Sequence, residues 1–211
     1  MPPLPSLFFK GSNSIAGHGE TVEIPKICQD DQADYEGELV VIIGKDAKNV
    51  SKDDALDYVL GYTAGNDVSS RLLCNSLAAL LISRKWQRDP KLAGGVPQWG
   101  FSKSCNHLDG DSLTLLGLTN TPPWVRRLLH LRYRLCENSL IWEVIPDPST
   151  LVLETRVNGQ LRQSTNTSDM LFDVRTLIAF LSQGTTLEAG SIIMTGTPEG
   201  IRQHSIRAQS E

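Results

Sequence analysis

Three acidic residues in the first third of the chain have the spacing of a metal site. Glu36 and Glu38 stand two apart at the head of the apolar run 39–43, and Asp67 follows a second strand-like stretch, residues 58–64. Residues two apart on a β-strand point to the same face, so a strand would place the two glutamates side by side. Burying such a pair is costly unless a cation or hydrogen bonds compensate, and a hard divalent ion such as Mg²⁺ does so through oxygen ligands. The alternative is that both glutamates are solvated residues where a strand begins, and the spacing alone favours that alternative.

The elements that must position these residues are short and mixed in type. Residues 35–43 are predicted to be the strand that carries the glutamates, and residues 20–28 a shorter strand before it. Residues 51–62 favour a short helix, because Ser51 is a good N-cap and the acidic residues after it suit the positive first turn.

The C-terminal part of the chain alternates strand and helix signals. Residues 150–157 and 161–165 are predicted to form a hairpin around the Asn-Gly pair in 157–160. Residues 173–184 read as an amphipathic helix that stops at Gly184. A turn over 187–190 then leads to a buried strand, 191–196, which delivers Thr197 and Pro198 to its end.

The order of several motifs is more specific than any one of them. They are FFKG (8–11), YEGELVVIIGK (35–45), GYTAGNDVSSR (61–71), KWQ (85–87), QWGFSKS (98–104), IPDPSTLVLETRVNGQLRQ (145–163) and STNTSDMLFDVRTLIAFLSQGTTLEAGSIIMTGTPEG (164–200). Together they resemble the fumarylacetoacetate hydrolase superfamily, in its smaller single-domain branch, over about two-thirds of the chain. The combination of ExE, NDVS and TGTP after a strand carries the resemblance.

The resemblance implies an α+β fold, a mixed β-roll that is incomplete if the ends are cut, in one domain over residues 1–211. It also implies a divalent ion, Mg²⁺ or alternatively Mn²⁺ or Ca²⁺, held by Glu36, Glu38 and Asp67.

Four further residues are carried over from the same resemblance. Lys103 in FSKS matches the lysine that approaches the metal-bound substrate, and Gln87 in KWQ matches a polar residue of the substrate pocket. Thr197 in TGTP matches a residue at the substrate carboxylate, and Lys10 in FFKG matches a lysine expected at the pocket rim.

The implied chemistry is that of a small 2-oxo acid or 1,3-dicarbonyl compound that chelates the ion through two oxygens. The ion polarises the carbonyl, and a cation such as Lys103 stabilises the charge that develops as an enolate. The same intermediate serves C–C hydrolysis, decarboxylation or keto–enol tautomerisation of, for example, an oxaloacetate-like diacid. Resemblance therefore implies a metal-dependent enzyme, and a homodimer, without choosing the product.

Two segments depart from the family pattern. Residues 72–83 form an uncharged, leucine-rich stretch, interpreted either as an extra helix or as sequence of non-native origin. Residues 104–143 replace the loop that is expected to close over the metal, and they contain the basic stretch 124–134. That stretch can form an amphipathic helix, but a solvated or poorly folded segment is the preferred interpretation.

Both ends of the chain also look cut. The family's smaller members carry a His and Glu pair on a lid upstream of the strand that holds the two glutamates, residues 35–43, which is called the metal strand below. No matching segment precedes FFKG. His18 and Glu20 come after FFKG and do not fit that pair. The chain as written is therefore expected to have weak activity or none, and an unpaired sheet edge where a closing strand is missing.

Three functional hypotheses follow. The first is a Mg²⁺-dependent enzyme acting on a 2-oxo acid or 1,3-dicarbonyl compound. The second is a catalytically defective relative that arises from an aberrant gene model. The third is a binding module that uses the basic stretch 124–134, and it predicts binding that persists without Mg²⁺.

Composition excludes several other classes. The formal net charge of -4 argues against nucleic acid or an anionic membrane as partner, and no apolar run is long enough for a transmembrane helix. The four cysteines show no CxxC pair and no zinc spacing, which favours free thiols in a reducing compartment. The first residues lack the features of a secretory or transit peptide, so a cytoplasmic location is expected, with a mitochondrial one as the alternative.

Overall fold

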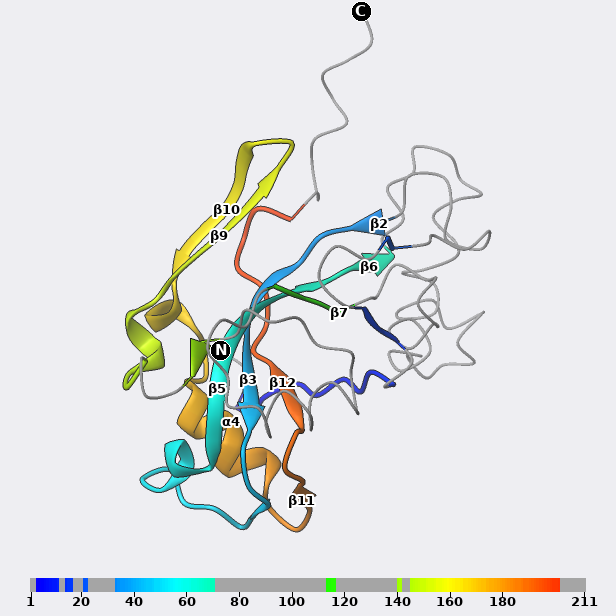
Figure 1. Cartoon of the computed structure of the whole chain (residues 1–211). Coiled ribbons are helices and arrows are strands. Elements are labelled where there is room, and N and C mark those ends of the chain that lie inside the picture. Colours follow the sequence, from blue (N-terminus) through cyan, green and yellow to red (C-terminus); the bar gives the residue numbers. More distant parts are fainter. Residues whose placement is uncertain are drawn as a thin grey trace, which may run out of the picture.

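The structure is a computed structural model, and it describes residues 3–11, 14–16, 21–22, 33–70, 113–116, 140–141 and 145–201. A mixed sheet lies at its centre (Figure 1). Within the described residues this sheet has six strands, with the order β1-β7-β5-β3-β12 and β8 paired to β5. Their bounds are β1 (Ile15–Ala16), β3 (Gly37–Ile43), β5 (Val59–Asp67), β7 (Leu113–Leu116), β8 (Leu140–Ile141) and β12 (Ile192–Met194).

The smaller elements surround this sheet. β1 runs parallel to β7, and the other pairs of the central sheet are antiparallel. Among the described residues, three two-stranded sheets join β9 (Val152–Val157) to β10 (Gln160–Asn166), β4 (Ala47–Lys48) to β11 (Thr186–Leu187), and β2 (Ala33–Asp34) to β6 (Ser69–Ser70). The helices that the structure describes are α4 (Val174–Leu181) and short 3-10 turns at Ala55–Tyr58, Pro148–Thr150 and Thr167–Asp169.

The strand β3 is buried along its whole length, and its two faces carry different residues: one packs in the hydrophobic core and the other carries the glutamates. Leu39, Val41 and Ile43 belong to the hydrophobic core together with Val174 and Ile178 of α4. Because side chains alternate across a strand, the glutamates that precede this run belong to the opposite face. The strand therefore separates the helix-packed core from the acidic residues.

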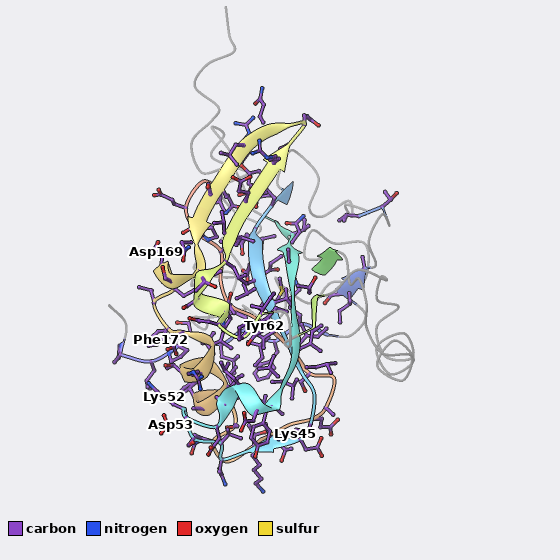
Figure 2. The ribbon with its side chains drawn as sticks, turned by 60° about the vertical axis from the view of Figure 1, so that its left-hand side comes forward. Lys45, Lys52, Asp53, Tyr62, Asp169 and Phe172 are labelled. Carbon is purple, nitrogen blue, oxygen red and sulfur yellow. The ribbon has the colours of Figure 1, made fainter. Side chains whose placement is uncertain are left out.

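The partner strand β5 follows the same alternation. Tyr62 lies opposite Val41 in the register and belongs to the same core, between the sheet and α4 (Figure 2). Burial raises the pKa of Tyr62 to about 12, although the positive charge of Arg175 acts in the other direction. The phenol therefore stays neutral at physiological pH, as a core residue should.

The hairpin β9–β10 confirms the prediction made from the Asn-Gly pair. Asn158 and Gly159 have φ values of 51° and 79°, the signs that a tight two-residue hairpin turn requires. The hairpin extends away from α4 (Figure 1), and β9 packs on β3. A bulge interrupts the pairing between Leu161 and Gln163.

The predicted helix over residues 51–62 is wrong. The Asp54 N–H donates to Ser51 Oγ at 3.2 Å, but this bond lies in the turn before the 3-10 turn Ala55–Tyr58, whose N-cap is Asp54 and which has no side-chain cap bond. From Val59 the chain is strand β5, because pairing with β3 outweighs the weak helix preference of a few residues. Asp57 is exposed in that turn.

Other predicted boundaries shift by a few residues. The strand predicted over 35–43 is β3, the one predicted over 191–196 is β12, and the helix predicted over 173–184 is α4. The turn predicted over 187–190 begins later, because Leu187 is still paired in β11. Of the strand predicted over 20–28, Thr21 and Val22 are not in a strand, and residues 20 and 23–28 lie outside the described residues.

The atypical segment 104–143 contributes two strands to the central sheet. β7 and β8 both pair antiparallel with β5, so this segment is joined to the sheet at these points. The segment 72–83 and the basic stretch 124–134 lie outside the described residues. None of the described helices has the length and apolar character that a membrane span requires.

The N-terminal cap of α4 contributes to the stability of the fold in a way that can be tested. Asp173 caps the helix, accepting a hydrogen bond from the Thr176 N–H at 2.7 Å. Burial raises the pKa of Asp173, but the hydrogen bonds from Thr176 and the charges of Lys52 and Arg175 outweigh it, so the pKa lies below 3.8. The stability that the ionised cap contributes is therefore present above the ordinary pKa and is lost as pH falls through the lower folded-state value.

We predict that Asp173→Ala lowers the free energy of unfolding by about 1 kcal/mol at pH 7, measured by urea denaturation. The difference from the unmodified chain should shrink as the pH is lowered below 3.8. Asp57→Ala, which removes an exposed carboxylate, is the control and should change little. An equal effect of both substitutions would contradict the capping role.

Candidate functional site

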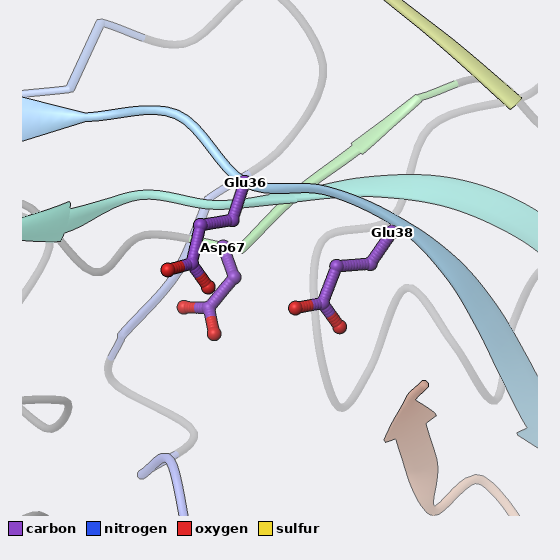
Figure 3. Close-up of side chains that lie close together, drawn as sticks. All are labelled: Glu36, Glu38 and Asp67. Carbon is purple, nitrogen blue, oxygen red and sulfur yellow. The ribbon is translucent and has the colours of Figure 1, made fainter. Parts of the chain in front are cut away.

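Three buried carboxylates converge where β3 and β5 run side by side (Figure 3). The register pairs Gly37 with Asn66 and Glu38 with Gly65, so Glu36 lies across from Asp67 at the next step. Each of the three residues offers a carboxylate oxygen, and these oxygens all lie within 4.8 Å of one another. The pair of strands thus brings together the three residues that the sequence singled out.

The burial of these side chains makes the arrangement energetically demanding. Glu36, Glu38 and Asp67 are 9%, 3% and 7% exposed. Close carboxylates with little access to water repel one another, and positive charge must compensate. Lys10 supplies part of it, since its Nζ lies 2.6 Å from Asp67 Oδ1.

The donor set fits a hard divalent cation. Three carboxylates and one ammonium sum to a formal charge of -2, and carboxylate oxygens are the ligands that Mg²⁺, Mn²⁺ and Ca²⁺ prefer. Glu36, Glu38 and Asp67 would hold such an ion. Within the part of the chain that the structure describes, no other cluster of His, Cys, Asp or Glu meets this spacing.

Backbone and amide groups hold the three acidic residues in place. The Gly196 N–H donates to Glu38 Oε2 at 2.8 Å, and φ at Gly196 is +97°, a conformation that residues with a side chain rarely adopt. The Glu36 N–H donates to Asn66 Oδ1 at 3.0 Å. The Asp67 N–H donates to the Glu36 carbonyl at 2.8 Å. The two glutamates and Asp67 are therefore held by the strand pair and by the segment after β12.

That segment, Thr195–Gly200, runs back along β3. Thr195 hydrogen-bonds the Leu39 carbonyl through both its N–H and its hydroxyl. The Thr197 hydroxyl donates to the Gly37 carbonyl at 3.0 Å. Further along, the Tyr35 hydroxyl donates to the Gly200 carbonyl at 2.9 Å. Thr195, Thr197 and Gly200 thus each hydrogen-bond a residue in the range 35–39.

The structure brings together part of the predicted site. Glu36, Glu38 and Asp67 form one cluster, and Lys10 contacts Asp67 of that cluster. Thr197 lies against the metal strand, where its hydroxyl proton goes to Gly37. The other two predicted residues, Gln87 and Lys103, lie outside the described residues.

Sequence reasoning missed Gln163, Asn66 and Gly196. Gln163 is 2% exposed, and its side chain accepts from the Gly37 N–H at 3.0 Å. Its inward direction depends on the bulge in β10, which strand alternation alone does not reveal. Asn66 and Gly196 stand within motifs that carried the resemblance, but their contacts become visible only with the register of β5 and the path after β12.

The chain is similar to known proteins in both sequence and fold. The sequence profile described as "Fumarylacetoacetate (FAA) hydrolase C-terminal" matches residues 1–210. Oxaloacetate tautomerase YisK of Bacillus subtilis is 38% identical over 201 residues, which are 95% of this chain and 52% of the relative. Caffeoylpyruvate hydrolase of Neonothopanus nambi is 37% identical over 204 residues, 95% of this chain and 50% of the relative. The chain thus spans about half the length of these curated relatives.

A solved structure gives the same result for the fold. The crystal structure of 5-carboxymethyl-2-hydroxymuconate delta-isomerase from Mycobacterium smegmatis superposes with a TM-score of 0.65 and 29% identity. The match covers 95% of this chain and 62% of that one. The α+β architecture is therefore shared with a solved relative.

The Lys10–Asp67 ion pair yields a prediction about charge. Replacing Lys10 with Met removes a cation next to the three carboxylates, so Mg²⁺ affinity measured by calorimetry should rise by about tenfold. The metal-free protein should lose about 2 kcal/mol of unfolding free energy, because the buried Asp67 loses a partner.

Lys45→Met is the matched control, since the Lys45 ammonium lies 4.5 Å from the centre of the Tyr58 ring and away from the carboxylates. It should leave Mg²⁺ affinity unchanged. Weaker Mg²⁺ binding by Lys10→Met would show that Lys10 supports the bound ion instead of competing with it.

Proposed function

Because the chain belongs to the fumarylacetoacetate hydrolase family, we propose that it forms the metal-binding part of an enzyme acting on a 2-oxo acid or 1,3-dicarbonyl compound. The observation that carries the proposal is the cluster of Glu36, Glu38 and Asp67, whose oxygens lie within 4.8 Å of one another. Mg²⁺ is the proposed ion, with Mn²⁺ and Ca²⁺ as alternatives of the same chemistry.

A bound divalent ion would act as a Lewis acid on the substrate carbonyl and orient the chelating oxygens. The residues of the chain have the remaining tasks. Glu36, Glu38 and Asp67 supply ligands from a buried strand pair that does not need to reorganise. Lys103 is proposed to stabilise the negative charge that develops on the substrate oxygen, and Gln87 to line the substrate pocket.

The hydrogen bonds of the Thr197 hydroxyl limit how this residue could bind a substrate carboxylate. Its hydroxyl has one proton, which is donated to the Gly37 carbonyl, and the same oxygen accepts from Gln163 Nε2 at 2.8 Å. Recognition of a substrate carboxylate at this position would therefore use the backbone N–H of Thr197. The hydroxyl would serve to hold the backbone in place.

The substrate class is supported by the relatives. Their names refer to oxaloacetate and caffeoylpyruvate, which share a 2-oxo acid group, and to tautomerase and hydrolase activities. We propose the same substrate class here. The metal site supports it over a binding module built on the stretch 124–134, because a binding module has no need of three buried carboxylates.

The larger organisation is proposed from the family. The central sheet would be part of a mixed β-roll in a single domain over residues 1–211, in accord with a profile match to 1–210. A homodimer is proposed on the family resemblance alone.

The activity is tested with oxaloacetate and with an acylpyruvate, following the enol absorbance of each in the ultraviolet. We predict that Mg²⁺ accelerates enol–keto interconversion or C–C cleavage, that EDTA removes the acceleration and that added Mg²⁺ restores it. Lys103→Met should lower the rate by about a hundredfold while Mg²⁺ binding persists.

The matched control is Lys48→Met, which replaces an exposed lysine of β4. A rate that does not change with EDTA would contradict a metal-dependent reaction. No acceleration of either substrate by a chain that binds Mg²⁺ would contradict the proposed substrate class.

A further inference from the structure

The amide of Gln163 makes a buried set of hydrogen bonds behind the acidic site. Its Oε1 accepts from the Gly37 N–H at 3.0 Å, and its Nε2 donates to Thr197 Oγ1 at 2.8 Å and to the Pro198 carbonyl at 3.1 Å. The side chain is 2% exposed. A single side chain thus joins the metal strand to the segment that follows β12.

These bonds take the place of a missing strand neighbour. β12 ends at Met194, and Thr195 still bonds the Leu39 carbonyl. Gly37 stands two residues before Leu39, so its N–H and C=O face the same side of β3, beyond the end of β12. There the N–H is satisfied by the Gln163 amide and the C=O by the Thr197 hydroxyl. Backbone groups at such a position need partners, and side chains supply them.

A bulge turns Gln163 inward. Leu161 pairs with Arg156 and Gln163 pairs with Thr155, so Arg162 is the additional residue in β10. Without the bulge, Leu161 and Gln163 would face the same side of the hairpin. With it, Leu161 is 47% exposed and Gln163 is buried. Bulges commonly re-aim a side chain beside a functional site.

We propose that Gln163 is a positioning residue for the acidic site, holding Gly37 and the segment Gly196–Pro198 at the spacing that aims Glu36 and Glu38. The inference rests on the proposed function of the three carboxylates as metal ligands. Gly37 lies between the two glutamates, so any shift of its peptide moves both.

The hairpin leaves Gly37 no room for a side chain. A Cβ on Gly37 would overlap Thr155 Oγ1 of β9 and lie 3.1 Å from Gln163 Oε1, so the hairpin packs directly on the backbone of the metal strand. Gly196, next to Thr197, donates to Glu38 Oε2. Gln163 therefore acts on Glu38 from two directions, through Gly37 and through the segment that contains Gly196. Supports of this kind typically change metal affinity by about 10- to 100-fold when removed.

The test uses Mn²⁺ as a spectroscopic probe, with free and bound ion measured by electron paramagnetic resonance. Gln163→Met keeps the length of the side chain and removes the amide. We expect it to weaken Mn²⁺ binding by about tenfold and to change the spectrum of the bound ion. Gln160→Met is the matched control, because Gln160 is exposed on the same strand and hydrogen-bonds Arg162. It should match the unmodified chain in both readouts.

A merely structural role would lower the unfolding temperature of Gln163→Met without changing Mn²⁺ affinity or the bound spectrum, and that result would overturn the inference. Thr197→Val, which removes the hydroxyl that donates to the Gly37 carbonyl and accepts from Gln163 Nε2, is the second variant should Gln163→Met not fold. It should weaken Mn²⁺ binding by about threefold, and unchanged binding there would also overturn the inference. If the unmodified chain binds no Mn²⁺, the proposed function itself fails, which is a different outcome.

Discussion

Three buried carboxylates whose oxygens lie within 4.8 Å of one another impose the constraint that the rest of the structure must meet. Such a cluster costs free energy through repulsion and lost hydration. It persists only if the two strands that carry it cannot slip. A slip of one residue is costly because it would turn Glu38 toward α4 and bury its carboxylate in the hydrophobic core. Val40 and Ile42, on the same face as the glutamates, are themselves 0% and 1% exposed. Burial of both faces of β3 thus holds the register that places the charges.

Around the cluster, side chains hydrogen-bond the backbone groups of β3 that have no neighbouring strand. The strand β12 is short, and where it ends the segment Thr195–Gly200 continues along β3 with hydroxyl and amide partners. The hairpin β9–β10 closes the back of Gly37 and supplies Gln163. Lys10 balances part of the negative charge directly at Asp67. Together these contacts leave the carboxylates aimed at one point with a charge that a divalent ion can neutralise.

Much of this arrangement follows from the sequence, and the exceptions have physical reasons. The glutamates two apart before an apolar run, the Asn-Gly hairpin and the helix capped by Asp173 depend on local pattern, and each is present. The helix predicted over 51–62 was wrong because pairing of β5 with β3 decided its second half. The positions of Gln163 and Lys10 depend on a bulge and on a contact across 57 residues, and neither has a local signal. Long-range register is therefore what sequence reasoning lacked.

Calorimetric titration of Mg²⁺ into the intact chain and into Glu36→Ala/Glu38→Ala tests whether the buried carboxylates bind a metal ion. We expect saturable binding by the intact chain, and equally by a Glu154→Ala control in which the exposed ion pair with Arg156 is removed. We expect no saturable binding by the double variant. Equal binding by the double variant, or none by the folded intact chain, would contradict the claim that these carboxylates form a metal site.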